Sequence, residues 1–249
     1  MLRLGFAYHA FQETIIGRVV EHFTEIKNEE PMNRVVVIDY GMGNLHSVGK
    51  ALEHLDKNIS LSITDDPTLI READRLIFPG VGAIRDCMKE IRRHKIDTLL
   101  NEARTEKPIL GICVGMQAMM EFSEENNGVE CLGLFPGSVN GFKTGMHDEN
   151  GDTLKVPHMG WNKVRQSMKH PMWNRIEDES RFYFVHSYFV TPDTKKQDSA
   201  LVAGETEYPD TFCSALAAEN IFAVQFHPEK SQDCGLQLLD NFLSWDGKS

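Results

Sequence analysis

The feature that most constrains this fold is a short apolar run that ends in a cysteine flanked by glycines. Residues Ile109–Ile112 read as a buried strand, and the chain then continues through Cys113 into a stretch with helical spacing, Gln117–Phe122. The pattern Gly111-Ile112-Cys113-Val114-Gly115 between a strand and a helix matches a nucleophile elbow with Cys in place of Ser. We therefore expect Cys113 at the tip of a sharp strand-to-helix turn.

The elbow implies a chemistry for Cys113. The helix that follows directs its N-terminal N–H groups and the positive end of its dipole toward the sulfur, which favours the reactive thiolate. The same turn places the Val114 N–H where it can stabilise an oxyanion. A buried structural cysteine between two packing glycines fits the motif alone equally well, and the strand before and helix after it favour the nucleophile.

Two further strands end in glycine-rich turns. Val35–Ile38 precedes Asp39–Asn44, and Leu76–Phe78 precedes Pro79–Gly82. Strands followed by helices predict a parallel sheet covered on both faces. More strand-like runs follow Leu132, namely Leu154–Val156, Phe182–Val190, Leu201–Ala203, Phe212–Ala217 and Phe222–Phe226. We predict an α/β fold with a mixed, mainly parallel sheet flanked by helices, with ligands at the carboxyl ends of strands.

The chain organisation predicts one domain, residues 32–249, after an extension, residues 1–31. The first strand signal starts only after a second methionine, Met32. Apolar residues of the extension, including Ile15, Val19 and Phe23, recur at near-helical spacing, but no signal-peptide pattern is present. An upstream translation start or a cloned extension explains residues 1–31, and an added docking helix is the alternative. We favour the first explanation.

A second candidate motif lies near the carboxyl end of the chain. The strand Phe222–Phe226 runs directly into His227-Pro228-Glu229. Residues i and i+2 of an extended segment point the same way, and Pro228 stiffens the turn. Glu229 is therefore placed to orient His227, and His227 to act as the base for Cys113. A histidine beside a solvated glutamate is the commoner fate of such a tripeptide, but its occurrence together with the elbow favours a triad.

Composition excludes several other classes. The net charge of −11 argues against nucleic-acid binding, and no apolar run approaches the ~20 residues that span a bilayer. The five cysteines are widely spaced, with no C-x-x-C pair, which is typical of a reduced, cytoplasmic chain without disulfides or a zinc site. We expect no metal and no organic cofactor.

At this point the residues resemble a known family. Gly111–Gln117 and Gln225–Glu229 resemble the class I, triad-type glutamine amidotransferases. Five further runs narrow the resemblance to the glutaminase subunits of imidazole glycerol phosphate synthase, namely Asp39–Asn44, Pro79–Gly82, Pro157–Asn162, Tyr183–Tyr188 and His227–Ser231. The likeness covers the chain from about Met32 to its end, and Pro157–Asn162 is the discriminating run.

The resemblance implies a role for each matching residue. Cys113 matches the nucleophile, His227 the general base and acid, and Glu229 its orienter. Residues matching positions that hold glutamine are Gly82, Gln117, Glu125, Ser187 and Tyr188. Val81 and Val114 match the oxyanion hole, whose loop in this family can be misoriented until the partner is engaged. Residues matching the partner face are Asn44, Met159, Trp161, Asn162, Tyr183 and Lys230.

The implied function is hydrolysis of glutamine to glutamate and ammonia. The ammonia would pass to a (β/α)8-barrel cyclase, joined to this chain as a heterodimer, which makes imidazole glycerol phosphate and aminoimidazole carboxamide ribotide in histidine biosynthesis. Three alternatives stay open: a glutaminase subunit of another biosynthetic amidotransferase, a docking subunit without chemistry, and a stand-alone γ-glutamyl thiol hydrolase.

Overall fold

The computed structural model describes residues 33–55, 58–143, 145–147, 151–196 and 201–248. The predicted extension, residues 1–31, lies outside these residues, so the proposed domain boundary stays a prediction. Among the described residues, no helix is long and apolar enough to cross a membrane.

The first half of the described chain alternates strands and helices. Its elements are β1 (Asn33–Ile38), α2 (Leu45–Leu55), β2 (Ile59–Thr64), α3 (Pro67–Glu72), β3 (Arg75–Gly80), α4 (Ile84–Arg93), α5 (Ile96–Ala103), β4 (Ile109–Cys113), α6 (Val114–Ala118), β5 (Met120–Ser123), η1 (Glu125–Asn127) and β6 (Val129–Glu130). The second half is richer in strands, with β7 (Phe135–Gly141), β8 (His158–Gln166), η2 (Pro171–Trp173), β9 (Ser180–His186), β10 (Tyr188–Pro192), β11 (Leu201–Tyr208), β12 (Asp210–Ala218), β13 (Ile221–Val224), η3 (Pro228–Lys230) and α7 (Gln232–Ser244).

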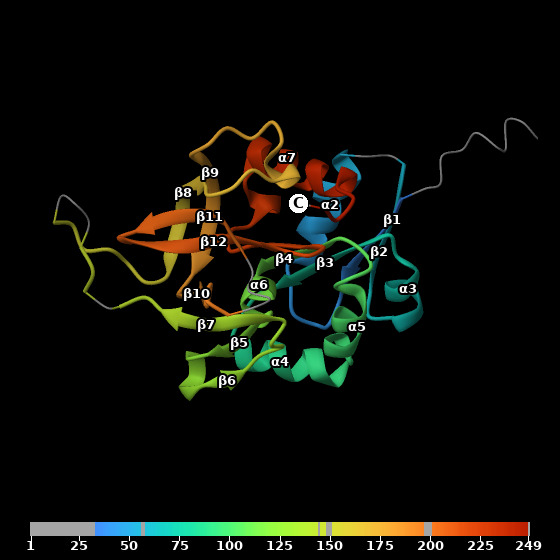
Figure 1. Ribbon diagram of the computed structural model, residues 1–249, viewed down its shortest axis with the longest axis horizontal. Helices are drawn as coiled ribbons and strands as arrows, with labels where there is room; N and C mark the ends of the chain where they lie inside the picture. The colour runs from blue at the N-terminus through green and yellow to red at the C-terminus, as the bar shows by residue number, and fades with distance from the viewer. Residues whose placement is uncertain (1–32, 56–57, 144, 148–150, 197–200, 249) are drawn as a thin grey trace, which may run out of the picture. The chain divides into compact units, whose positions relative to one another are not determined.

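These strands form one mixed sheet, which confirms the predicted fold class. Strands β2, β1, β3, β4 and β13 lie side by side in that order and are parallel. Strands β3, β4 and β13 are almost entirely buried and apolar, as expected for strands covered on both faces. Figure 1 shows α2 and α7 on one side of these strands and α4 and α5 on the other.

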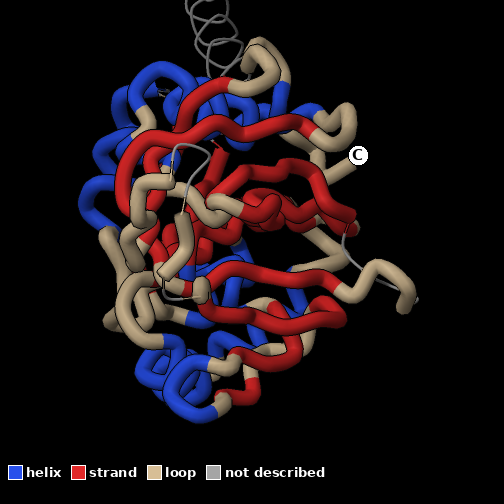
Figure 2. Tube along the Cα trace, turned by 90° about the vertical axis from the view of Figure 1, so that its left-hand side faces the viewer, coloured by secondary structure: helices blue, strands red, loops and turns tan. Residues whose placement is uncertain are grey.

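The second half of the chain extends the sheet with antiparallel strands. Strand β12 pairs antiparallel with β13, β10 and β11, and β8 joins β11 to β9. In Figure 1 these strands extend to the left of the parallel group, and Figure 2 shows them in red running beside one another. After Leu132 most strand pairs are therefore antiparallel, although β13 pairs parallel with β4 and β7 pairs parallel with β5.

Three predicted elements were wrong in detail. Leu154–Val156 is not a strand, since only Thr153 of that neighbourhood makes an isolated bridge, to His147. The predicted helix over Gln117–Phe122 ends at Ala118, because Met120–Ser123 pairs with β7 and β6. Phe182–Val190 is two strands, β9 and β10, interrupted at Ser187 where pairing passes from β8 to β7.

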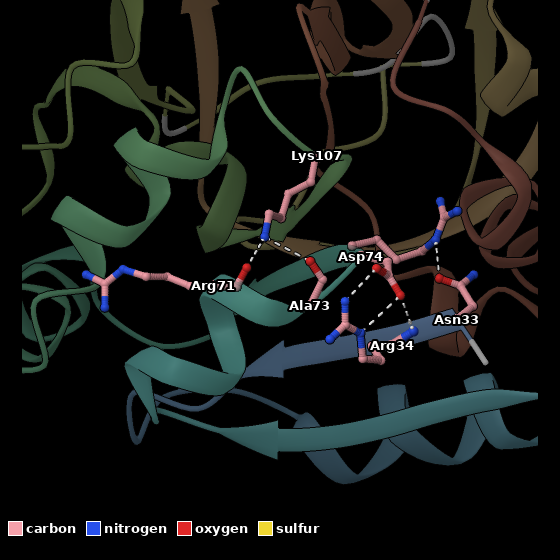
Figure 3. A network of polar contacts seen from close by, with 7 residues as sticks. Asn33, Arg34, Arg71, Ala73, Asp74 and Lys107 are labelled. Atoms are coloured by element: carbon pink, nitrogen blue, oxygen red, sulfur yellow. Dashed lines mark hydrogen bonds and ion pairs between the residues drawn. The ribbon is translucent and has the colours of Figure 1, made fainter. Parts of the chain in front are cut away.

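A polar network lies at the amino ends of the parallel strands, opposite the edge that carries Cys113 (Figure 3). Arg34 at the start of β1 forms an ion pair with Asp74, with Nη2 and Oδ1 3.1 Å apart. Lys107 Nζ donates to the carbonyl oxygens of Arg71 and Ala73, at 2.5 and 2.8 Å, where α3 ends. These bonds satisfy carbonyl groups that a helix terminus leaves without partners. This edge is held by structural contacts, and the candidate site forms at the other.

Candidate active site

Cys113 occupies a strained turn between β4 and α6. Its backbone angles are φ 55° and ψ −113°, a conformation that non-glycine residues rarely adopt. The turn lies tightly against β3, since a Cβ on Gly115 would lie 2.0 Å from the carbonyl oxygen of Phe78. Gly115 is therefore required by close backbone approach, and the elbow predicted from the sequence is present in the structure.

His227 and Glu229 form a buried pair. Nδ1 of His227 lies 2.9 Å from Oε1 of Glu229, and their side chains are 3% and 1% exposed. His227 is extended, but Pro228–Lys230 form the short helix η3, so Glu229 does not lie in the extended segment that the sequence predicted; the turn itself brings its carboxylate to the His227 ring. A histidine held in this way by a carboxylate has a defined tautomer and ring orientation.

Two backbone contacts and a hydroxyl hold the turn that carries His227. The His227 N–H donates to the carbonyl oxygen of Tyr183 at 2.9 Å. Ser231 Oγ accepts the Tyr183 N–H at 2.9 Å and donates to the His227 carbonyl oxygen at 2.6 Å. The turn is thus attached to both backbone groups of Tyr183 on β9. Ser231 lies in a run that resembles the family, but it was not predicted as a site residue.

The electrostatics of His227 favour its charged form. Burial lowers the pKa of His227, but the Cys113 thiolate and the Glu229 carboxylate outweigh it and raise the pKa to about 10. Nε2 of His227 is buried and has no hydrogen-bond partner among the described residues. An imidazolium with a free Nε2–H is therefore available to donate a proton to a group that enters beside the sulfur.

A cavity of about 410 Å³ is lined by Cys113, His227 and all of the predicted substrate residues. Its lining comprises Val81, Gly82, Cys113, Val114, Gln117, Glu125, Pro157, Val185, His186, Ser187, Tyr188, His227 and Lys230. The catalytic candidates Cys113 and His227, all five predicted glutamine-binding residues and both predicted oxyanion residues therefore share one cavity. Glu229 lies behind His227, as the role of an orienting group requires.

The predicted oxyanion residues come from two elements. Val114 begins α6, and Val81 and Gly82 follow β3, where Gly82 has a φ of 91°. Glu125 Oε2 accepts the Ile84 N–H at 3.1 Å, which attaches η1 to the start of α4 beside this loop. The neighbouring Glu124 instead bonds the backbone of β7 through Gly141. The structure thus places Glu125 in the cavity and Glu124 outside its lining.

A buried amide pair lies behind the nucleophile. Gln117 Nε2 donates to Gln225 Oε1 at 3.0 Å and to the Tyr188 carbonyl oxygen at 2.9 Å. Gln225 Nε2 points at Cys113 Sγ, 3.7 Å away, and Gln225 is fully buried. The sequence prediction did not include Gln225 in the site, although a glutamine inside the apolar run Phe222–Phe226 is a signal of a buried polar role.

The predicted partner residues do not lie in the cavity, apart from Lys230. Met159 and Trp161 on β8 are 61% and 40% exposed, so Trp161 is not a core residue. Trp161 lies opposite Tyr183 of β9 in the strand register, and their rings meet edge-on. Asn162 is half-buried, and its side chain turns to the other face of β8, where it contacts His158 and the Glu207 carbonyl oxygen. Exposed apolar side chains grouped in this way are typical of an interaction surface.

Asn44 is placed by a different element. It precedes α2, where its carbonyl oxygen accepts the Val48 N–H, and α2 packs against η3, which carries Lys230.

Among the described residues, no group of three or more His, Cys, Asp or Glu side chains is arranged to hold a metal ion. All five cysteines are free.

Comparisons with known proteins bear on the family of this chain. The family model of glutamine amidotransferase class I matches residues 36–244. The chain is 58% identical over 217 residues to imidazole glycerol phosphate synthase subunit HisH 1 of Pseudomonas aeruginosa, covering 87% of this chain and 99% of that protein. It is 55% identical over 218 residues to subunit HisH of Nitrosococcus oceani, covering 88% of this chain and 100% of that protein.

Solved structures show the same fold at low identity. A putative GMP synthase protein from Thermoplasma acidophilum superposes with a TM-score of 0.63 at 20% identity, covering 86% of this chain and 94% of that chain. The structure of PurLQS from Thermotoga maritima superposes with a TM-score of 0.62 at 19% identity, covering 86% and 98%.

Proposed function

The chain belongs to the class I glutamine amidotransferases and, within that family, to the HisH subunits of imidazole glycerol phosphate synthase, and we propose that Cys113, His227 and Glu229 are its catalytic triad. The chain is thus a glutaminase subunit of histidine biosynthesis. The observation that carries the triad is the strained Cys113 turn in one cavity with His227, whose ring is held by the buried Glu229.

The proposed reaction begins at the sulfur. The Cys113 thiolate attacks the side-chain amide carbon of glutamine, and the electron pair of the C=O bond moves to oxygen. Protonated His227 gives its Nε2 proton to the amide nitrogen, so that ammonia leaves and a γ-glutamyl thioester remains. His227 then takes a proton from water, which attacks the thioester and releases glutamate and the thiolate.

The cavity supports assignments for the other groups. Backbone N–H groups of Val114 and of the Val81–Gly82 loop would stabilise the oxyanion, where one good donor contributes about 3–4 kcal/mol. Gln117 and Glu125 would hold the glutamine, and the backbone at Ser187 and Tyr188 would receive its α-carboxylate. Support comes from the position of all these residues on the walls of one cavity.

We also propose the finer description of the partner. HisH proteins are subunits of imidazole glycerol phosphate synthase by name, and the second subunit would be a (β/α)8-barrel cyclase in a heterodimer. Met159, Trp161, Asn162, Tyr183, Lys230 and Asn44 would face it. Ammonia needs a covered route into that cyclase, since ammonium is not a nucleophile. Five free cysteines support a reduced, cytoplasmic setting.

The test is glutamate release from glutamine by the chain alone and with the barrel cyclase and its nucleotide substrate. Strong activation by the loaded cyclase supports a coupled glutaminase of histidine synthesis. Equal turnover with and without the cyclase contradicts the proposal and favours a stand-alone γ-glutamyl hydrolase. Activation by the synthase partner of another pathway instead contradicts the assigned partner while keeping the triad.

A further inference from the structure

Two buried histidines connect the half-buried Asn162 of β8 to the cavity. His158 lies in β8 and His186 ends β9, and they are 3% and 6% exposed. Nδ1 of His158 lies 2.9 Å from Nε2 of His186. Nδ1 of His186 lies 2.8 Å from the carbonyl oxygen of Tyr188, and Nε2 of His158 lies 3.3 Å from Nδ2 of Asn162. The triad makes no use of this chain of contacts.

At the cavity end of this series of hydrogen bonds, the contact with the Tyr188 carbonyl oxygen determines which atom of each histidine donates and which accepts. The Tyr188 carbonyl oxygen only accepts, so Nδ1 of His186 carries a proton and, in the neutral ring, Nε2 is an acceptor. His158 must then donate from its own Nδ1, which leaves its Nε2 as an acceptor. Asn162 must therefore present its NH₂ group to His158.

The Asn162 end independently requires the same direction. Oδ1 of Asn162 accepts the Lys163 N–H at 2.8 Å, and Nδ2 donates to the Glu207 carbonyl oxygen at 2.9 Å. Reversing the amide would place its oxygen against the Glu207 carbonyl and its NH₂ against an N–H. The orientation that avoids both is the one that donates to His158. Two separate backbone contacts thus specify one tautomer for each histidine.

The surroundings keep both rings neutral. His158 is stacked between Phe184 and Tyr208, with ring centroids 4.9 and 3.9 Å away. Burial lowers the pKa of His158 to about 4 and that of His186 to about 3. An additional proton on His186 would place its Nε2–H against the Nδ1–H of His158, and one on His158 would place its Nε2–H against the Asn162 NH₂ group, so neither charged form fits these contacts.

The series of hydrogen bonds ends at the Ser187–Tyr188 backbone, which other segments hold on both sides. The Tyr188 carbonyl oxygen accepts from His186 and from Gln117, which follows the nucleophile on α6. The neighbouring Ser187 carbonyl oxygen accepts the Phe142 N–H at 3.0 Å. This is the segment where β9 passes into β10 and where the cavity wall includes Ser187 and Tyr188. Losing the His186 bond would free one side of this wall.

We propose that His158 and His186 are positioning residues that hold the Ser187–Tyr188 backbone for the α-carboxylate of glutamine, and that Asn162, one of the predicted partner residues, sets the direction in which their hydrogen bonds are donated. This rests on the proposed function for the identity of the ligand. If a contact with the partner moves the Asn162 NH₂ group away from His158, the change would pass through His158 and His186 to the Tyr188 carbonyl oxygen. Glutamine binding would then change through this series of hydrogen bonds.

The first test reads the tautomers and needs no activity. Long-range nitrogen–proton spectra of the full chain with isotope-labelled histidine, recorded near neutral pH, should show His158 and His186 neutral and protonated at Nδ1. In Asn162→Asp no NH₂ remains, so His158 should carry a proton on Nε2 as well and become an imidazolium, while the Tyr188 carbonyl oxygen keeps the His186 proton on Nδ1. A wild-type His186 protonated at Nε2, or an Asn162→Asp variant in which Nε2 of His158 stays unprotonated, overturns the proposal.

The second test separates glutamine binding from chemistry in the complex at saturating cyclase. His158→Phe keeps the stacked ring and removes both nitrogens, so the KM for glutamine should rise about tenfold, as for loss of one buried hydrogen bond, while kcat changes less than about twofold. Alkylation of Cys113 by iodoacetamide, which has no α-carboxylate, should be unaffected. His170→Phe is the matched control, because His170 is also buried against an aromatic ring, Phe222, but lies outside the cavity lining.

The outcomes separate this proposal from the proposed function. A wild-type complex that fails to hydrolyse glutamine contradicts the function, while the tautomer spectra still decide whether the chain of bonds exists. An active wild-type complex with an unchanged KM in His158→Phe overturns the positioning role. A fall in kcat and in alkylation rate together, with KM constant, also overturns it, because that pattern shows general damage to the Cys113 turn.

Discussion

Nδ1 of His227 lies 2.9 Å from Oε1 of Glu229, and both side chains are almost completely removed from solvent. The second carboxylate oxygen of Glu229 has no hydrogen-bond partner among the described residues. Glu229 therefore acts mainly on His227, and three properties of that ring depend on it: its tautomer, its orientation and its charge.

Glu229→Gln should move the alkaline limit of the glutaminase to lower pH. After the opposing effect of burial, the charges of Cys113 and Glu229 raise the pKa of His227 to about 10, so the imidazolium is present below that pH and is lost as pH rises through it. Without the Glu229 charge this loss begins earlier. We expect kcat near neutral pH to fall roughly 100-fold. The pH profile of glutamate release by the complex measures both effects, with the exposed Glu130→Gln as control.

Cys113→Ala should abolish glutamine hydrolysis and leave ammonia-dependent synthesis by the complex. The sulfur is the only group lost, and the cyclase chemistry is expected on the other subunit. Glutamate release and product formation with added ammonium salt are the two measurements. Cys234→Ala is the control, since Cys234 is a free, half-buried cysteine on α7. Retained glutamine turnover in Cys113→Ala would end the assignment of the nucleophile.

Gly115→Ala should destabilise the protein and misplace the nucleophile. The added Cβ would lie 2.0 Å from the backbone oxygen of Phe78, so α6 or β3 must move. We expect a loss of about 1–3 kcal/mol or more in the free energy of unfolding. Denaturant unfolding measures this loss. Gly49→Ala in α2 is the contrast, because its Cβ would meet only the ends of the Ile63 and Leu61 side chains, at 3.1 and 3.7 Å, and Ala is the better helix former there by up to ~1 kcal/mol.

Trp161→Ala should weaken binding of the cyclase without unfolding the chain. The ring is 40% exposed and packs edge-on against Tyr183, next to the exposed Met159. A central aromatic contact of this kind contributes about 2 kcal/mol or more to binding, equivalent to roughly a 30-fold change in Kd. Calorimetric titration with the cyclase measures it. Phe122→Ala, at an exposed aromatic of β5 outside the predicted face, should bind as the wild type does. Unchanged binding and unchanged coupling in Trp161→Ala would contradict the interface.

Removal of the extension is the remaining prediction. A chain that begins at Met32 should retain glutaminase activity and binding to the cyclase, since the family match covers residues 36–244 and every candidate site residue lies after Met32. Glutamate release by the two chains, compared at equal concentration with saturating cyclase, measures this. A shortened chain that folds but loses turnover would show that residues 1–31 contribute to function.

Much of the site was predictable because its signals are local. The elbow needs a strand, a tight turn and small residues within a few positions of Cys113, and all are adjacent in the chain. His227 and Glu229 are likewise only two residues apart, so their pairing was predictable, although the turn that joins them is the short helix η3 and not an extended segment. The alternation of apolar strands and helices before Leu132 predicted the parallel part of the sheet for the same reason.

Other features depended on contacts between distant segments. The apolar run after Gln117 has helical spacing, yet it becomes β5 because β7 offers it a pairing partner. The break at Ser187 exists because β9 pairs with β8 and β10 pairs with β7. Gln225 reaches Cys113 across 112 positions of sequence. No local pattern states which strand a segment will meet.

The sequence by itself determined the family and predicted the nucleophile and the pairing of a histidine with a glutamate, since each is written in residues that are neighbours along the chain. Only the tertiary structure decided that His158 and His186, 28 positions apart, share a hydrogen bond and connect Asn162 to the Tyr188 carbonyl group. The physical reason is burial: removed from water, these polar atoms must find partners within the protein, and the folded strands alone determine which partners are within reach.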